Sequence, residues 1–234
     1  MDRWIDETLY PGWGQRLKVS RLLHEEKTGL QHLVIFENEM LGRCFMLDGC
    51  VQVTMADEFI YHEMMVHVPL LALAEPKDVL VIGGGDGGIL REVLKHQSVK
   101  RAILCEIDRS VVEMAQKWFP ELSDGAFTSK RVDVVIGDGV KFVADARKKF
   151  DAVIVDSTDP HGPGAVLFTK SFYADCKRCL KPGGVLVTQN GVPFMQPDEL
   201  RQSVGHFREL FADGSCYLAT IPTYAGGPMA MGWA

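Results

Sequence analysis

The chain has 234 residues, of which 47% are hydrophobic, and a formal net charge of −6. This length can bury one sizeable core with a small extension, and the acidic balance argues against nucleic acid as a partner. No stretch reaches the roughly 18 apolar residues of a membrane span, and the first residues lack signal-peptide character, so we expect no membrane partner and a cytoplasmic location.

Residues 1–56 are predicted to form a small N-terminal antiparallel β unit. Apolar runs occur at 33–36, 44–47 and 51–54, and residues that favour turns separate them. Short apolar runs between turn residues are typical of strands joined by hairpins.

Residues 57–234 are predicted to form the second domain. Its first helix should be capped by Asp57, and Pro69 should kink this helix or end its first half. From residue 76 onward apolar runs alternate with helical patterns, which indicates an α/β fold with a parallel sheet wound with helices. The predicted strands are 79–82, 102–105, 132–136, 152–155 and 185–188, the helices are 89–95, 110–118, 139–149, 170–180 and 197–211, a turn lies at 181–184, and 217–221 with 229–234 should close the sheet as an antiparallel hairpin.

The six cysteines are expected to be reduced thiols, because the chain shows no secretory signal. Cys176 and Cys179 form a C-x-x-C pattern within a predicted helix. No second pair stands at the spacing of a zinc site, so we expect no metal.

A glycine-rich loop points to nucleoside binding. Gly83 to Gly88 fits G-x-G-x-x-G between a predicted strand and a predicted helix, with Gly83 and Gly85 in the first two glycine positions. Glu106 follows about 20 residues later at the end of the next strand, where an acid can accept hydrogen bonds from both ribose hydroxyls.

Asp86 stands inside this loop and restricts the ligand. A pyrophosphate at the helix N-terminus would be repelled by this carboxylate, which argues against NAD, FAD and ATP. S-adenosylmethionine or a relative with a sulfonium fits better. A decarboxylated arm that ends in an ammonium would be attracted to Asp86.

Further acids follow the predicted strands. In an open α/β sheet, ligands bind beyond the carboxyl ends of the strands, where these acids are expected to lie. Gln189 is expected at the same edge of the sheet, after the fifth predicted strand. Asp138 could instead be only the cap of the next helix. Several acids at one rim would repel each other unless cations are brought to them. The acids are Asp86, Glu106, Asp138, Asp156 and Asp159.

Motifs from Trp4 to the last residue resemble those of the spermidine synthases, the polyamine aminopropyltransferases. This resemblance implies a Rossmann-like class I methyltransferase-type domain after the β unit, assembled as a homodimer or homotetramer. Family members usually continue past the equivalent of Ala234, so we expect either that the chain is truncated at its C-terminus or that those elements are missing. The motifs are His24-Glu25-Glu26-Lys27-Thr28, Leu47-Asp48-Gly49, Asp57 to Met64, Gly83 to Gly88, Glu106-Ile107-Asp108, Asp156 to Pro160, Gln189-Asn190-Gly191 and Ile221-Pro222-Thr223-Tyr224.

The resemblance implies aminopropyl transfer from decarboxylated S-adenosylmethionine, a co-substrate, to putrescine, with spermidine and methylthioadenosine as products and no cofactor. For the donor it implies Asp86 at the ammonium, Glu106 at the ribose, Asp138 with Gly139 at the adenine, and Gln31 as a further contact. For the acceptor it implies Asp156 and Tyr61 at the attacking amine, and Asp159, Gln189 and Tyr224 around the diamine. For His62 two roles stay open, a structural role and a contact with the donor.

Asp156 is the expected general base. Desolvation and the neighbouring Asp159 are expected to raise the pKa of Asp156, which brings it closer to the pKa of an alkylammonium.

Two other functions remain open from the sequence. One is an S-adenosylmethionine-dependent amine N-methyltransferase, although relatives that transfer methyl groups to putrescine lack an acid at the position of Asp86. The other is an inactive nucleoside-binding homologue, for which a damaged acid set would be expected. The choice among putrescine, cadaverine, agmatine and spermidine depends on pocket length and stays open.

Overall fold

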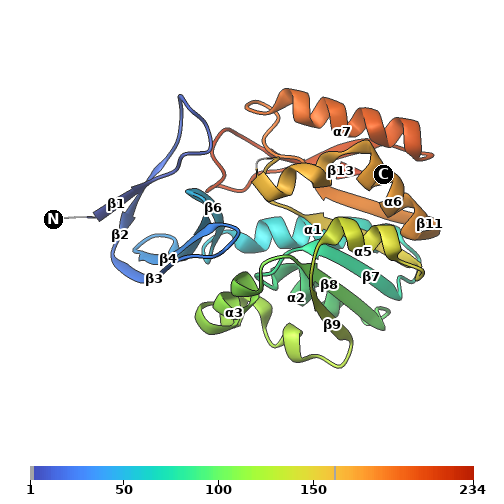
Figure 1. Ribbon diagram of the computed structural model, residues 1–234, viewed down its shortest axis with the longest axis horizontal. Helices are drawn as coiled ribbons and strands as arrows, with labels where there is room; N and C mark the ends of the chain where they lie inside the picture. The colour runs from blue at the N-terminus through green and yellow to red at the C-terminus, as the bar shows by residue number, and fades with distance from the viewer. Residues whose placement is uncertain (1–2, 161) are drawn as a thin grey trace.

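The computed structural model describes residues 3–160 and 162–234, so residues 1–2 of the predicted N-terminal unit lie outside it. Its N-terminal part consists of two antiparallel sheets at one end of the molecule (Figure 1). A two-stranded sheet contains β1 (Arg3–Asp6) and β2 (Arg16–Val19), and a four-stranded sheet contains β3 (Arg21–Lys27), β4 (His32–Asn38), β5 (Gly42–Leu47) and β6 (Cys50–Thr54). The predicted β unit is confirmed, and β1 and β2 add to it.

Strand β4 is buried on both faces of the four-stranded sheet, which explains its continuous apolar run. Leu33 and Ile35 pack with Val111 and Phe119 of the following domain. Their neighbour Val34 packs on the opposite face with Leu17 of β2. Because successive strand residues point to opposite faces, a strand covered on both sides has no polar alternation.

The second part contains a seven-stranded sheet in the order β12-β13-β11-β10-β7-β8-β9. The strands β11, β10, β7, β8 and β9 run parallel to one another. The antiparallel pair β12–β13 continues the sheet beside β11, as the sequence predicts. Chain order reverses between β7 and β10, where ligands bind in folds of this type. The bounds are β7 (Asp78–Gly83), β8 (Arg101–Glu106), β9 (Val132–Ile136), β10 (Phe150–Asp156), β11 (Leu180–Gln189), β12 (Ser215–Ala219) and β13 (Met229–Trp233).

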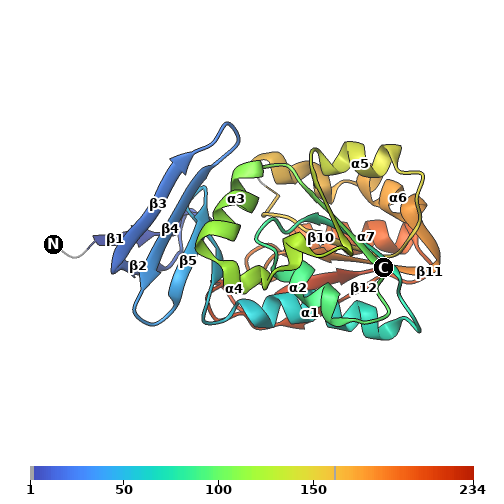
Figure 2. The same cartoon turned by 90° about the horizontal axis from the view of Figure 1, so that it is seen from below.

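Helices cover both faces of this sheet (Figure 2). One face carries α1 (Glu58–Ala72) and α2 (Gly88–Lys95), and the other carries α5 (Gly139–Asp145), α6 (Lys170–Cys179) and α7 (Pro197–Leu210). Between the sheet and the N-terminal unit lie α3 (Arg109–Trp118) and α4 (Pro120–Ser123), and two short 3₁₀ segments are η1 (Ala126–Thr128) and η2 (Gly162–Phe168). None of the helices in the described ranges combines the length and apolar character that a membrane crossing needs.

Two local predictions need correction, and a third needs it in part. Pro69 does not end the first half of α1, which continues to Ala72; the alternative that Pro69 kinks the helix stays a prediction. The helix expected over 139–149 stops at Asp145, because Phe150 already begins the next buried strand. The predicted turn at 181–184 lies within β11, where the pairing register shifts and Gly183 has a positive φ of 77°, so these residues form a bulge.

Asp57 stands at the predicted start of α1 but does not cap it with its side chain. Its buried carboxylate instead accepts hydrogen bonds from the Thr54 hydroxyl at 2.6 Å and from the amide and hydroxyl of Thr223 at 2.9 and 2.8 Å. The N-terminus of α1 is therefore tied to the segment that carries Tyr224.

Candidate active site

A cavity of about 440 Å³ lies at the carboxyl ends of the parallel strands, beside the point where chain order reverses. The sheet, α1 and the N-terminal unit all contribute to its wall. Every residue that the sequence predicts for the site lines this cavity: Gln31, Tyr61, His62, Gly83, Gly85, Asp86, Glu106, Asp138, Gly139, Asp156, Asp159, Gln189 and Tyr224.

The glycine loop brings the backbone close to two of the acids. A Cβ at Gly83 would lie 2.0 Å from the carbonyl oxygen of Asp156, and Gly83 also has a positive φ of 76°. A Cβ at Gly85 would lie 2.8 Å from Cγ of Glu106. Side chains at either position would push apart the strand ends that carry these acids.

Asp156 ends β10 and faces Tyr61 of α1. The Tyr61 hydroxyl donates a hydrogen bond of 2.5 Å to Oδ1 of Asp156. Burial and the charge of Asp86 raise the pKa of Asp156 to about 6, although His62 and the Tyr61 hydroxyl act in the opposite direction. The acid that raises this pKa is thus Asp86 and not the expected Asp159, because the glycine loop folds back over the end of β10.

Asp86 is held by both a backbone and a side-chain donor. Its Oδ1 accepts a hydrogen bond of 2.7 Å from the amide of Gly88, and its Oδ2 lies 3.5 Å from Nε2 of His62. Ligand atoms of His62, Asp86 and Asp156 all lie within 4.8 Å of one another. The two carboxylates of this group can bind an ammonium.

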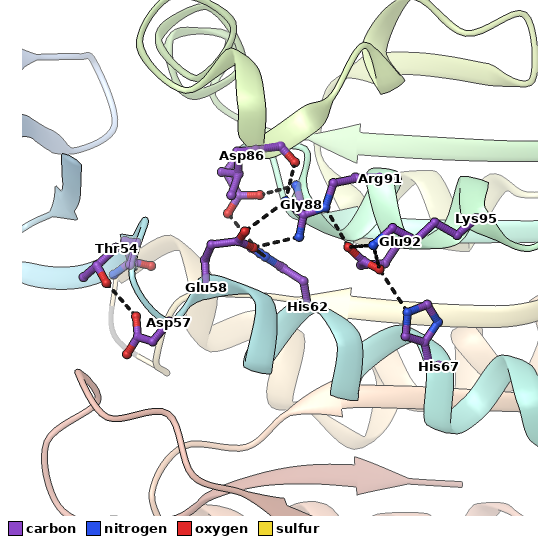
Figure 3. A network of polar contacts seen from close by, with 12 residues as sticks. Thr54, Asp57, Glu58, His62, His67, Asp86, Gly88, Arg91, Glu92 and Lys95 are labelled. Carbon is purple, nitrogen blue, oxygen red and sulfur yellow. Dashed lines mark hydrogen bonds and ion pairs between the residues drawn. The ribbon is translucent and has the colours of Figure 1, made fainter. Parts of the chain in front are cut away.

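His62 is part of a row of charged side chains that leads away from the cavity (Figure 3). Its Nδ1 lies 2.6 Å from Oε2 of Glu58. The two carboxylate oxygens of Glu58 each accept one hydrogen bond of 2.9 Å from Arg91. Burial by itself would lower the pKa of His62, but Asp86 and Glu58 raise it to about 10. At neutral pH the His62 side chain is therefore a positively charged imidazolium, which the sequence did not predict.

Several residues that are predicted to contact the donor lie at the end of β8 and the start of α5. Burial raises the pKa of Glu106 to about 7, and its Oε1 accepts a hydrogen bond of 2.8 Å from the amide of Asp108. Gln31 donates a hydrogen bond of 3.0 Å to Oδ2 of Asp108. Asp138 caps α5 by accepting a hydrogen bond of 2.8 Å from Val140, so the expected capping role is present in a residue that also lines the cavity.

Asp138 is followed by Gly139, where a Cβ would lie 2.5 Å from Cγ2 of Ile82. The start of α5 therefore reaches the end of β7 only because residue 139 has no side chain.

Asp159, Gln189 and Tyr224, which are predicted to surround the diamine, form the predicted acceptor side of the cavity. Oε1 of Gln189 is buried and has no hydrogen-bond partner within the described part of the chain, which makes it available to an amine donor. Asp159 accepts a hydrogen bond of 2.8 Å from Gln196, and the Tyr224 hydroxyl donates one of 2.6 Å to the carbonyl of Gln52. The rings of Tyr61 and Tyr224 pack edge to face at 5.9 Å.

Some lining residues were missed by the sequence analysis. Glu7 and Tyr10 come from the segment between β1 and β2, whose sequence has no regular apolar pattern. Gln196 accepts a hydrogen bond of 3.0 Å from Tyr10 and bonds to Asp159, which connects this segment to the acceptor side. Only the folded arrangement brings these residues together, because Tyr10 and Gln196 are far apart in the sequence.

Comparison with known proteins agrees with this architecture. Residues 58–234 match the family model described as spermine/spermidine synthase domain, and residues 3–55 match the spermidine synthase tetramerisation domain. The chain is 55% identical over 227 residues to polyamine aminopropyltransferase 1 of Pseudomonas aeruginosa, covering 97% of this chain and 79% of the relative. It is 54% identical over 230 residues to polyamine aminopropyltransferase of a Ruegeria species, covering 98% and 81%.

Two solved structures share the fold over the full length of this chain. A crystal structure of spermidine synthase in complex with the transition state analogue AdoDATO has a TM-score of 0.96 and 40% identity, and 81% of that chain is covered. Spermidine synthase from Thermotoga maritima has a TM-score of 0.92 and 38% identity, with 80% covered. The chain therefore belongs to the spermine/spermidine synthase family, with its Rossmann-like class I methyltransferase-type domain.

Proposed function

We propose that this enzyme transfers an aminopropyl group from decarboxylated S-adenosylmethionine to putrescine and releases spermidine and methylthioadenosine. The observation that carries the proposal is the position of Asp86, a carboxylate in the nucleoside-binding loop within 4.8 Å of the ligand atoms of Asp156 and His62. An ammonium at the end of the donor's arm would be attracted there, whereas the carboxylate of S-adenosylmethionine would be repelled. The relatives named polyamine aminopropyltransferases support the same reaction.

The donor is proposed to bind across β7 and β8. Glu106 would accept hydrogen bonds from the ribose hydroxyls, Asp138 and Gly139 would contact the adenine, and Gln31 would complete this side. The relative solved with AdoDATO supports this placement through its shared fold. We propose decarboxylated S-adenosylmethionine as a co-substrate and no other cofactor.

The acceptor is proposed to lie between Asp156 and the group formed by Asp159, Gln189 and Tyr224. Its amine nitrogen attacks the methylene carbon next to the sulfonium. The new N–C bond forms as the C–S bond breaks, and that bond's electron pair stays on sulfur as a neutral thioether. The amine's extra proton goes to Asp156, so no metal or covalent enzyme intermediate is needed.

Proton transfer to Asp156 is made easier by its environment. An alkylammonium has a pKa near 10.4, about six units above a free aspartic acid. The pKa of Asp156 is about 6, which reduces this gap from the protein side. Desolvation of the amine in the cavity reduces it further from the substrate side.

A product assay tests the proposal. The enzyme is incubated with decarboxylated S-adenosylmethionine and, separately, putrescine, cadaverine, agmatine or spermidine, and the products are identified by mass spectrometry. We expect spermidine and methylthioadenosine from putrescine, and the same rate after treatment with EDTA. Methylated putrescine from S-adenosylmethionine would instead identify an N-methyltransferase, and no product with any pair would identify an inactive nucleoside-binding homologue.

We further propose that the enzyme is a homodimer or homotetramer in the cytoplasm, with the N-terminal sheets at the interface. The match of residues 3–55 to a tetramerisation domain supports this assembly. Trp4 of β1 and Leu22 of β3 remain 44% and 36% exposed, which gives this unit apolar surface for a second copy.

A further inference from the structure

Glu58 does not line the cavity, yet it determines the surroundings of a residue that does. Its side chain is buried, and its Oε2 lies 2.6 Å from Nδ1 of His62. The opposite ring nitrogen of His62 faces Asp86 at 3.5 Å. Both ring nitrogens thus face carboxylates, an arrangement that requires a proton on each of them.

The ring of His62 has little freedom to leave this position. A Cβ at Gly88 would lie 2.3 Å from Cε1 of His62, so the first turn of α2 presses directly on the imidazole. The ring of Tyr61 packs against it edge to face at 5.5 Å. Three charged groups face His62: Glu58 from α1, Asp86 from the glycine loop and Asp156 from the end of β10.

Glu58 is itself fixed from α2. Arg91 donates one hydrogen bond of 2.9 Å to each oxygen of Glu58, and the two partners are 13% and 8% exposed. Arg91 is held in turn by Glu92 at 2.6 Å and by the carbonyl of Leu122 at 3.0 Å. Burial alone would raise the pKa of Glu58, but His62 and Arg91 lower it to about 2, so Glu58 keeps its charge throughout the working range of the enzyme.

We propose that Glu58, clamped by Arg91, is a positioning residue that keeps His62 as an imidazolium whose Nε2–H aims Asp86 at the donor's ammonium. This role rests on the proposed aminopropyl transfer for its kinetic consequence, but the state of His62 is independent of turnover. If His62 were neutral with its proton on Nδ1, the Nε2 lone pair would face the carboxylate of Asp86 and repel it. A purely structural Glu58–Arg91 pair would join α1 to α2 and leave the charge of His62 unchanged.

The direct test is ¹⁵N nuclear magnetic resonance of the His62 ring between pH 6 and 10, compared in the wild type, Glu58→Gln and Glu63→Gln. Glu63 is exposed on the same helix, so Glu63→Gln removes an equal charge that does not touch the ring. We expect both ring nitrogens to remain protonated to about pH 9 in the wild type and in Glu63→Gln. In Glu58→Gln the titration midpoint should fall by about 1–3 pH units.

The kinetic test uses the same variants at pH 7.5 and across the pH range. Above the lowered His62 midpoint, Glu58→Gln should raise the KM for decarboxylated S-adenosylmethionine about tenfold with a smaller change in kcat, because Asp86 then loses a charged hydrogen-bond donor. Its activity should also decline at high pH with the midpoint that His62 shows by resonance. Glu63→Gln should match the wild type.

A neutral His62 in the wild type at pH 7.5 overturns the proposal even if Glu58→Gln does not fold. So does a Glu58→Gln variant with a lower Tm but an unchanged His62 midpoint, which would mean that Glu58 only joins the helices. Absence of aminopropyl transfer would refute the proposed function and leave the resonance result intact.

Discussion

Asp156 combines burial, a close hydroxyl donor and a neighbouring carboxylate, and these surroundings give it a pKa of about 6. The proposed base must be ionised, so kcat/KM for putrescine should rise with pH, reach half its plateau near pH 6 and be lost at lower pH. Replacing Asp156 by Asn should lower kcat by about 10²–10⁴-fold. Calorimetry should find methylthioadenosine binding retained, and unchanged turnover would refute the role as base.

Asp159 is the matched comparison for Asp156. Asp159 is proposed to contact the diamine, and its side chain accepts a hydrogen bond from Gln196. Asp159→Asn should mainly raise the KM for putrescine, by about tenfold, because one charged partner of the diamine is lost. A change confined to kcat would contradict this assignment.

Glu106 should couple nucleoside binding to proton release. Burial raises its pKa from 4.5 to about 7, so in the empty site this carboxyl group is mostly protonated at pH 6. Ribose hydroxyls donate to the ionised form and lower this pKa, so methylthioadenosine should bind more tightly as pH rises from about 5 to 7. Calorimetry at pH 6 in buffers with different ionisation enthalpies measures the protons released.

The control for this measurement is Glu106→Gln, which cannot titrate and should show the same heat in every buffer. Equal heats for the wild type would contradict the coupling.

The same raised pKa of Glu106 means that the folded state binds this proton more tightly than the unfolded chain. The free energy of unfolding of the empty enzyme should therefore receive a decreasing contribution from Glu106 as pH rises from 4.5 towards 7.

Among the elements, α1 connects several parts of the site. It carries Tyr61 and His62 on its first two turns, and Asp57 at its start ties it to Thr54 and Thr223. Tyr224 follows Thr223 and packs on Tyr61, so this tie also sets the acceptor wall.

Removal of this tie should reduce stability. Asp57→Ala should lower the free energy of unfolding by about 2–4 kcal/mol, because it leaves buried donors unpaired. Thr223→Val removes the hydroxyl but keeps the amide bond to Asp57, so its loss should be about 1 kcal/mol. Urea unfolding followed by circular dichroism measures both, and equal losses would show that the amide bond contributes nothing.

At the scale of the whole molecule, the N-terminal sheets form one end of the molecule (Figure 1), and Trp4 and Leu22 of these sheets are exposed. If this surface joins subunits, Leu22→Glu should shift the enzyme towards monomers in sedimentation velocity. Leu218→Glu is the matched control, because Leu218 is 55% exposed on β12 within the other sheet. A monomeric wild type, or equal effects of the two changes, would contradict the proposed interface.

Much of this protein was predictable from local pattern. The alternation of apolar runs and helical stretches gave the α/β class, and the closing β12–β13 hairpin is confirmed. The positions of the acids after strands also predicted which residues share the cavity, because parallel strands end at one edge of a sheet. Local pattern failed at Pro69 and at 181–184, where packing against the sheet outweighs the tendency of proline and glycine to end an element.

The sequence by itself determined the fold class and the acids that follow the parallel strands, since both follow from periodicity and from spacing along the chain, while Gln31, Tyr61, His62 and Tyr224 were expected only from the family resemblance. Only the tertiary structure decided which charges are neighbours: that Asp86 rather than Asp159 acts on Asp156, and that Glu58 and Arg91 hold His62 between two acids. Electrostatic energies depend on distance and burial in space, and neither quantity can be read from sequence separation.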